Sequence, residues 1–131
     1  MGEYLEKEHK VLRVAVLGAS PNRERYSNKA VRLLVEHGHE VLPVNPGHRE
    51  TEGLPAYPSL SAIAGPVHTV SIYVSAKQAA SYEAELLALR PERVIFNPGT
   101  EHPPLIAALR AAGMEVLEAC TIVMLRTGQF A

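Results

Sequence analysis

Small and basic residues between positions 18 and 29 have the types and spacing to bind an anion. An apolar run ends at Gly18, Ala19 and Ser20, and a polar loop then leads into a helix that is predicted to begin near Ser27. A strand-to-helix turn of small residues leaves backbone N–H groups open, and the helix dipole adds about half a positive charge there. The basic side chains of the same stretch are Arg23, Arg25 and Lys29. The stretch therefore predicts a phosphate site for a nucleotide-like ligand.

Five short apolar segments are predicted to form the strands that position this turn. They are residues 11–17, 40–44, 67–74, 94–96 and 114–117. The first is almost continuously apolar, which is typical of a strand covered on both faces. Strands that alternate with helices favour a parallel sheet with right-handed crossovers. We therefore expect an α/β fold, a Rossmann-like doubly wound parallel sheet of about five strands with helices on both faces in three α/β/α layers.

Capping residues predict where the helices begin and end. The expected helices run from Ser27 to Gly38, from Ser75 to Pro91 and from Thr100 to Gly113. Ser75 and Gln78 stand in capping-box spacing, which marks the start of the second helix. Residues 48–58 are rich in turn formers and are predicted to form a loop, followed by a short helical turn at 59–64. The apolar tail at 121–125 is too short to assign.

Ligands of doubly wound sheets bind beyond the carboxyl ends of the strands, where the strand order reverses. A dinucleotide site would show G-x-G-x-x-G after the first strand and an acidic residue about 20 residues later. Neither is present, so NAD is disfavoured. The second strand ends instead at neutral Asn45, with His48 and Arg49 just beyond. This pattern suits a ribose bearing a 3′-phosphate, because a carboxylate would repel that phosphate.

Five motifs occur in an order that resembles a known family. They are V-A-V-L-G-A-S-P-N at 14–22, E-V-L-P-V-N-P at 40–46, G-L-P-A-Y-P-S-L at 53–60, N-P-G at 97–99 and E-A-C at 118–120. They resemble the stand-alone CoA-binding proteins, which are similar to the N-terminal CoA-binding domain of the succinyl-CoA synthetase alpha subunit. The resemblance covers roughly residues 11–124. It implies the Rossmann-like fold, with coenzyme A or an acyl-CoA as the ligand.

The resemblance also implies which residues contact each part of CoA. The phosphates would contact Gly18, Ala19, Ser20, Arg23, Ser27, Asn28 and Lys29. The adenosine would be bounded by Val44, Asn45 and Pro46, and the cleft lined by Tyr73 and Val74. The pantetheine arm would face Asn97, Pro98 and Gly99. Cys120 is either a small buried residue or a neighbour of the CoA thiol able to form a mixed disulfide with it.

Two positions depart from the family pattern. Phe96 and Asn97 stand where a Trp and a Gln are common in the family. Residues 27–29, Ser-Asn-Lys, stand where a small-residue helix start is usual. The departures concern the contacts to pantetheine and phosphate, and leave the predicted fold unchanged.

Composition limits the domain organisation, the partners and the cellular location that can be expected. The chain has 131 residues, of which 47% are hydrophobic, so one domain is expected over 11–131, with residues 1–10 as an N-terminal extension or short helix. A net charge of -1 argues against a nucleic-acid or membrane-surface partner. The single cysteine and the absence of a signal-like or membrane-spanning run indicate a cytoplasmic protein. The six histidines show no metal-site spacing, so no metal is expected.

Three functions are left open by these patterns. The first is a non-catalytic CoA-binding carrier, sensor or regulator, working as a homodimer or with a separate enzyme partner. The alternative is a small nucleotide- or acyl-CoA-dependent enzyme, although no triad or G-x-S-x-G motif assigns a catalytic residue. Its candidate groups are Tyr73, Glu101, His102 and Cys120. The third is an NAD(P)-binding sensor domain.

Overall fold

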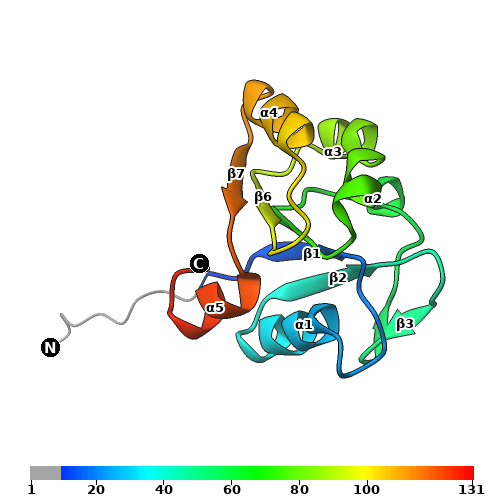
Figure 1. Cartoon of the computed structure of the whole chain (residues 1–131). Helices are drawn as coiled ribbons and strands as arrows, with labels where there is room; N and C mark the ends of the chain where they lie inside the picture. The colour runs from blue at the N-terminus through cyan, green and yellow to red at the C-terminus, as the bar shows by residue number, and fades with distance from the viewer. Residues whose placement is uncertain (1–9) are drawn as a thin grey trace, which may run out of the picture.

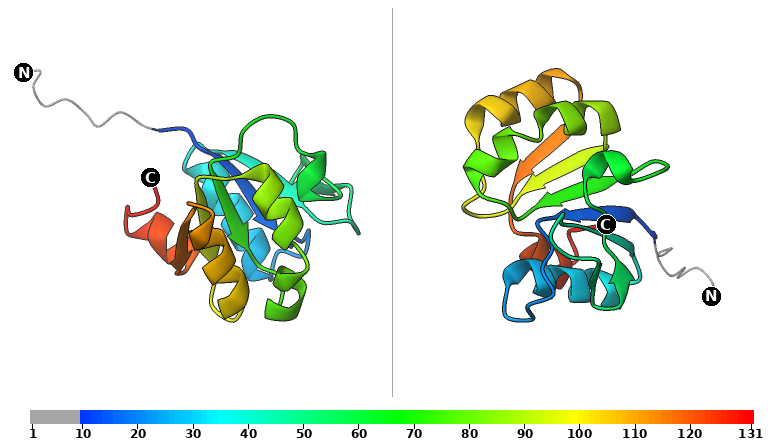
Figure 2. Two further views of the ribbon diagram at one scale, coloured as in Figure 1. Left: turned by 90° about the horizontal axis from the view of Figure 1, so that it is seen from above. Right: turned by 90° about the vertical axis from the view of Figure 1, so that its right-hand side faces the viewer.

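A central parallel sheet lies between two layers of helices (Figures 1 and 2). The computed structural model describes residues 10–131, so the expected N-terminal extension falls, apart from Lys10, outside the described residues. The strands of this sheet are β1 (Arg13–Leu17), β2 (Glu40–Val44), β5 (Thr69–Ile72), β6 (Arg93–Phe96) and β7 (Glu115–Glu118). They pair in parallel in the order β2-β1-β5-β6-β7. The predicted α/β sheet is confirmed.

Helices cover both faces of the sheet (Figure 1). One layer holds α1 (Tyr26–Glu36) and α5 (Thr121–Arg126), and the other holds η1 (Leu60–Ala62), α2 (Ala76–Ala80), α3 (Glu83–Leu89) and α4 (Pro103–Ala111). Successive residues of β1 alternate between the layers: Val14 and Val16 pack on the α1 and α5 side, and Ala15 and Leu17 on the other. Burial on both sides explains why the strand sequence is continuously apolar. No helix within residues 10–131 has the length and apolar character needed to span a membrane.

Residues 48–58 contain a hairpin and are not the plain loop that their composition predicts. β3 (Glu50–Thr51) and β4 (Leu54–Pro55) pair antiparallel across the two-residue turn Glu52-Gly53. Both turn residues have positive φ, 53° and 77°, as a type I′ turn requires. Glutamate is uncommon in that conformation, because its Cβ crowds the following carbonyl oxygen. Because the turn is Glu-Gly and not Asn-Gly or Asp-Gly, the sequence gives no clear signal for a hairpin here.

Two predicted helix caps are wrong. The N-cap of α1 is Arg25, and Ser27 is already helical and buried. The N-cap of α4 is His102, whose Nδ1 accepts a hydrogen bond from the Leu105 amide at 3.3 Å. Thr100 instead donates its hydroxyl proton to the Asn97 carbonyl at 2.7 Å. In both helices a residue outside the usual Ser, Thr, Asp and Asn set occupies the cap, so propensity alone misplaces the start.

The helix expected before Pro91 is divided into two. The capping box of Ser75 with Gln78 is confirmed at its start. The amides of Ser81 and Tyr82 then bond only three residues back, which tightens the turn and ends α2. α3 begins after this break, and the undecided tail at 121–125 forms α5.

Candidate functional site

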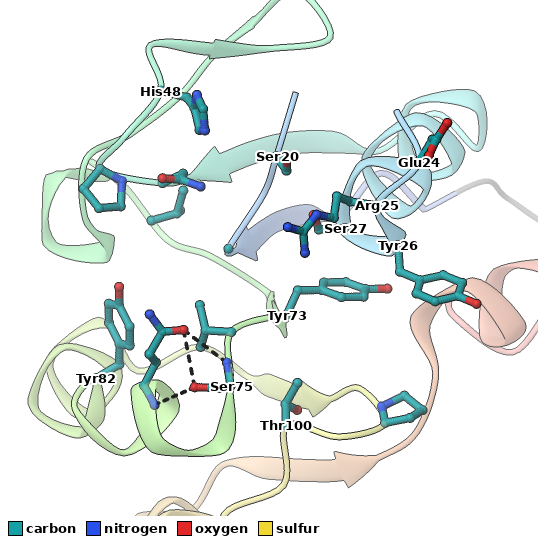
Figure 3. Close-up of a pocket in the computed structure, with 17 residues that line it drawn as sticks. Ser20, Glu24, Arg25, Tyr26, Ser27, His48, Tyr73, Ser75, Tyr82 and Thr100 are labelled. Carbon is teal, nitrogen blue, oxygen red and sulfur yellow. Dashed lines mark hydrogen bonds between the residues drawn. The ribbon is translucent and has the colours of Figure 1, made fainter. Parts of the chain in front are cut away.

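The strand order reverses between β1 and β5, because the chain adds β2 on one side of β1 and then crosses to the other. Loops diverge at such a point and leave a crevice. Here they frame a cleft of about 830 Å³ (Figure 3). The sequence-predicted residues that line it are Gly18, Ser20, Ser27, Val44, Asn45, Pro46, Tyr73, Val74 and Pro98. The cleft thus lies at the edge of the sheet that the sequence indicated.

Gly18 allows the end of β1 to pass close to the end of β5. Its φ is +91°, and a Cβ at this position would lie 2.9 Å from Val74 Cγ1 and 3.1 Å from the Tyr73 carbonyl carbon. The amides of Gly18 and Ala19 both point to the Val44 carbonyl, at 2.9 and 3.3 Å. They tie β1 to β2 and are not the open donors that the sequence predicted.

Open donors occur instead at the first turn of α1. The backbone amides of Tyr26 and Ser27 make no hydrogen bond to any other part of residues 10–131, as expected for the first residues of a helix. Arg25 directs its guanidinium into the cleft beside them (Figure 3). Within the described residues that side chain has no hydrogen bond or ion pair to another group of the protein. Two amides, a helix dipole and one cation therefore converge on one place, a favourable site for a phosphate.

The other basic residues of this stretch lie elsewhere. Arg23 pairs with Glu52 of the hairpin, Nη1 to Oε1 at 2.9 Å. Lys29 lies over the ring of Tyr26, 5.1 Å from the centroid. Neither lines the cleft. Three basic side chains occur within seven positions, so the sequence alone could not show that Arg25, which the resemblance does not assign to the phosphates, is the one facing the cleft.

The end of β2 forms the wall where adenosine was expected. The Asn45 side chain donates to the Ala19 carbonyl at 2.7 Å and accepts from the Gly47 amide at 2.8 Å. It thus fixes the turn in which Pro46 borders the cleft. His48 lies between the cleft and an adjoining hollow of about 400 Å³ that Arg49 also lines. Two basic side chains accordingly flank this end, as the 3′-phosphate hypothesis requires.

Tyr73 contributes the base of the cleft. Its hydroxyl oxygen is buried and has no hydrogen-bond partner within residues 10–131. Burial, and secondarily the nearby Cys120, raise the pKa of Tyr73 far above its usual value of 10. The hydroxyls of Ser71 and Thr121 lie close to it but bond to each other at 2.8 Å. Tyr73 therefore stays a neutral phenol throughout the physiological range.

The pantetheine side is built on a buried amide. Asn97 donates from Nδ2 to Ser71 Oγ and to the Ile72 carbonyl, both at 2.9 Å, and accepts from the Thr121 amide at 2.8 Å. It joins β5, β6 and α5 and is 2% exposed. Of residues 97–99 only Pro98 lines the cleft. Cys120 is partly exposed at the N-cap of α5, and it does not line the cleft.

Several lining residues lie outside the set of CoA contacts that the resemblance implied. They are Glu24, Arg25, Tyr26, His48, Ser75, Gln78, Tyr82 and Thr100. The capping box could have identified two of them, because it places the start of α2 directly after a strand end. Tyr82 follows the end of α2 at Ala80, a break that the sequence did not predict. Within residues 10–131 no three His, Cys, Asp or Glu side chains come together as metal ligands would.

Comparison with known proteins identifies the family of this chain. A family model described as "CoA binding domain" matches residues 12–126. A crystal structure of an uncharacterized protein is 38% identical, with a TM-score of 0.87, and the match covers 92% of this chain and 99% of that one.

Two curated proteins match shorter parts of the chain. The uncharacterized protein YneT of Bacillus subtilis is 33% identical over 75 residues, which are 57% of this chain and 56% of YneT. The ADP-forming acetate–CoA ligase I of Archaeoglobus fulgidus is 41% identical over 64 residues, which are 49% of this chain but 9% of the ligase. The matches thus span about half of one relative and a small part of the other. Taken with the matched family model, they confirm the expected resemblance: the chain belongs to the CoA binding domain family.

Proposed function

We propose that this protein binds coenzyme A, or an acyl-CoA, in the cleft at the ends of β1, β2 and β5, and that it does so without catalysing a reaction. The observation that carries the proposal is the meeting of Arg25 with the open amides of Tyr26 and Ser27 inside this cleft. Such a group favours a diphosphate. Family membership supports CoA as the molecule that brings it.

The cleft offers a place for each part of the ligand. With the diphosphate at the first turn of α1, the adenosine lies along Val44, Asn45 and Pro46. Its 3′-phosphate then comes near His48 and Arg49, the basic pair beyond β2. The pantetheine arm runs the other way, past Val74 and Pro98. A volume of about 830 Å³ lies within the usual range for small-molecule sites.

The chemistry of the lining residues supports binding rather than catalysis. Tyr73 keeps its proton because its pKa is raised, so it is a poor general base. Cys120, the single cysteine of the chain, stands outside the lining. A carrier, sensor or regulator in the cytoplasm, acting with a separate enzyme, fits this set of residues better than a small acyl-CoA-dependent enzyme.

Calorimetric titration of the protein, first stripped of any co-purified ligand, tests the proposal. CoA, dephospho-CoA and NAD are compared under one salt condition. CoA is expected to bind most tightly, because only it carries the 3′-phosphate, and NAD is expected to give no heat. Binding of NAD in place of CoA would refute the proposed ligand while leaving the fold unaffected.

Cys120 has its own test. If the thiol end of CoA passes Pro98 toward α5, thiolate exchange with oxidised CoA joins CoA to Cys120 and releases one molecule of reduced CoA. Intact-mass analysis would then show a CoA-sized adduct that is missing in Cys120→Ala. If the mass of the wild type is unchanged, Cys120 does not lie beside the CoA thiol.

A further inference from the structure

Glu52, in the turn of the β3–β4 hairpin, joins that hairpin to the loop before α1. Its Oε1 accepts a hydrogen bond from Arg23 Nη1 at 2.9 Å, and its Oε2 accepts one from Asn28 Nδ2 at 3.1 Å. The Glu52 side chain is 20% exposed. One carboxylate oxygen therefore bonds to the loop before α1 and the other to the first turn of α1.

Asn28 transmits this contact to the loop. It is completely buried, and its Nδ2 also donates to the Ser20 carbonyl at 2.9 Å. Its Oδ1 accepts from Arg32 Nε at 2.8 Å, and Arg32 Nη2 donates to the Arg23 carbonyl at 3.0 Å. Carbonyl groups near both ends of the loop are thus held by side chains of α1. With both its oxygen and its nitrogen occupied, Asn28 has no exposed group to offer a ligand.

The backbone at Glu52 indicates that its side chain is needed where it is. Its φ of +53° lies in the left-handed region, at the first central position of a type I′ turn. Asn, Asp and Gly are the residues favoured there. Asparagine would suit the turn better, but it is one methylene shorter and cannot reach both Arg23 and Asn28. A strained residue whose side chain is fully engaged is a feature that accompanies functional sites.

We propose that Glu52 is a positioning residue for the phosphate-binding loop, residues 20–25. Through Arg23 and Asn28 it holds the loop in the conformation that presents Arg25 and the first amides of α1 to the ligand. Glu52 does not itself line the cleft, so it acts through the loop and not by touching CoA. A loop ordered in advance loses less entropy when the ligand binds. This inference rests on the proposed CoA function.

Glu52→Asn separates positioning from folding. Because asparagine favours the turn, it offsets part of the cost of leaving one buried Asn28 N–H without its Glu52 acceptor, so the variant is expected to stay folded with only a small decrease in the free energy of unfolding. Its affinity for CoA is expected to fall about 3- to 10-fold, the loss that corresponds to one hydrogen bond. Glu52→Gln keeps the length and one acceptor for Asn28, so it should retain more affinity than Glu52→Asn. Glu50→Gln removes one charge from the same hairpin and should bind like the wild type.

Amide hydrogen exchange of the ligand-free protein measures directly how well the loop is ordered. The amides of Asn22 and Glu24 bond to Ser20 Oγ and Asn22 Oδ1 inside the loop, and they should exchange faster in Glu52→Asn. Unchanged exchange of these amides would overturn the inference. The inference would also be overturned if the wild type binds CoA and Glu52→Asn binds it with the same affinity. Failure of the wild type to bind CoA would refute the proposed function instead, and the exchange experiment would still decide whether Glu52 orders the loop.

Discussion

Arg25→Ala should weaken CoA binding more than the removal of other single charges. The Arg25 guanidinium points into the cleft and has no side-chain partner within residues 10–131, so its truncation leaves no buried group unpaired. The thermal midpoint should therefore stay unchanged. A charge-assisted hydrogen bond contributes about 1.5–3 kcal/mol, which corresponds to about a 10- to 150-fold loss of affinity.

Calorimetry at two salt concentrations is the assay. Arg126→Ala is the charge-matched control, because Arg126 is exposed in the last turn of α5 and does not line the cleft. Arg126→Ala should bind CoA like the wild type. Arg25→Ala should also depend less on salt, since it has lost one screened attraction to phosphate. Equal affinities of Arg25→Ala and Arg126→Ala would refute the assignment of the phosphate site.

Three further substitutions, two in the cleft wall and one behind it, are tested by urea unfolding. Gly18→Ala should lower the free energy of unfolding by about 1–2 kcal/mol or more and weaken CoA binding, because φ is +91° and the Cβ would meet Val74; unchanged stability would contradict this close approach. Asn97→Ala should cost about 3 kcal/mol, because three hydrogen bonds are lost; a cost below 1 kcal/mol would argue against a buried hub. Tyr73→Phe should gain about 1 kcal/mol, because it removes a buried, unpartnered hydroxyl. The pKa of Tyr73 is raised in the folded state, so wild-type stability should fall as pH rises above about 10, and Tyr73→Phe should lose less; parallel pH profiles would contradict the buried phenol.

Short apolar runs were sufficient to predict the strands of the sheet. The β2 segment is predicted to the residue, and the other strands differ at their ends by a few residues. Burial on both faces leaves a continuous apolar run, and that signal is local in the sequence. The cap at Arg25 and the turn at Glu52 were missed, because tertiary contacts override the preferences of single residues.

The candidate site was predictable in position but not in side-chain direction. The turn after β1 and the ends of β2 and β5 were identified because strand ends in such sheets meet at one edge. The sequence could not show that the Gly18 and Ala19 amides are used by Val44. Nor could it show that Glu52, in a hairpin with no turn signal, would pair with Arg23.

Amide chemical-shift mapping during a CoA titration tests the central claim most directly. Bound diphosphate should place its largest shifts at the amides of Tyr26 and Ser27, the open donors of α1, with smaller shifts at Val74. The amides of α4, which lies away from the cleft, should not move apart from its first turn near Pro98. Saturable CoA binding whose shifts centre on α4 and β7, leaving Tyr26 and Ser27 unchanged, would contradict the account.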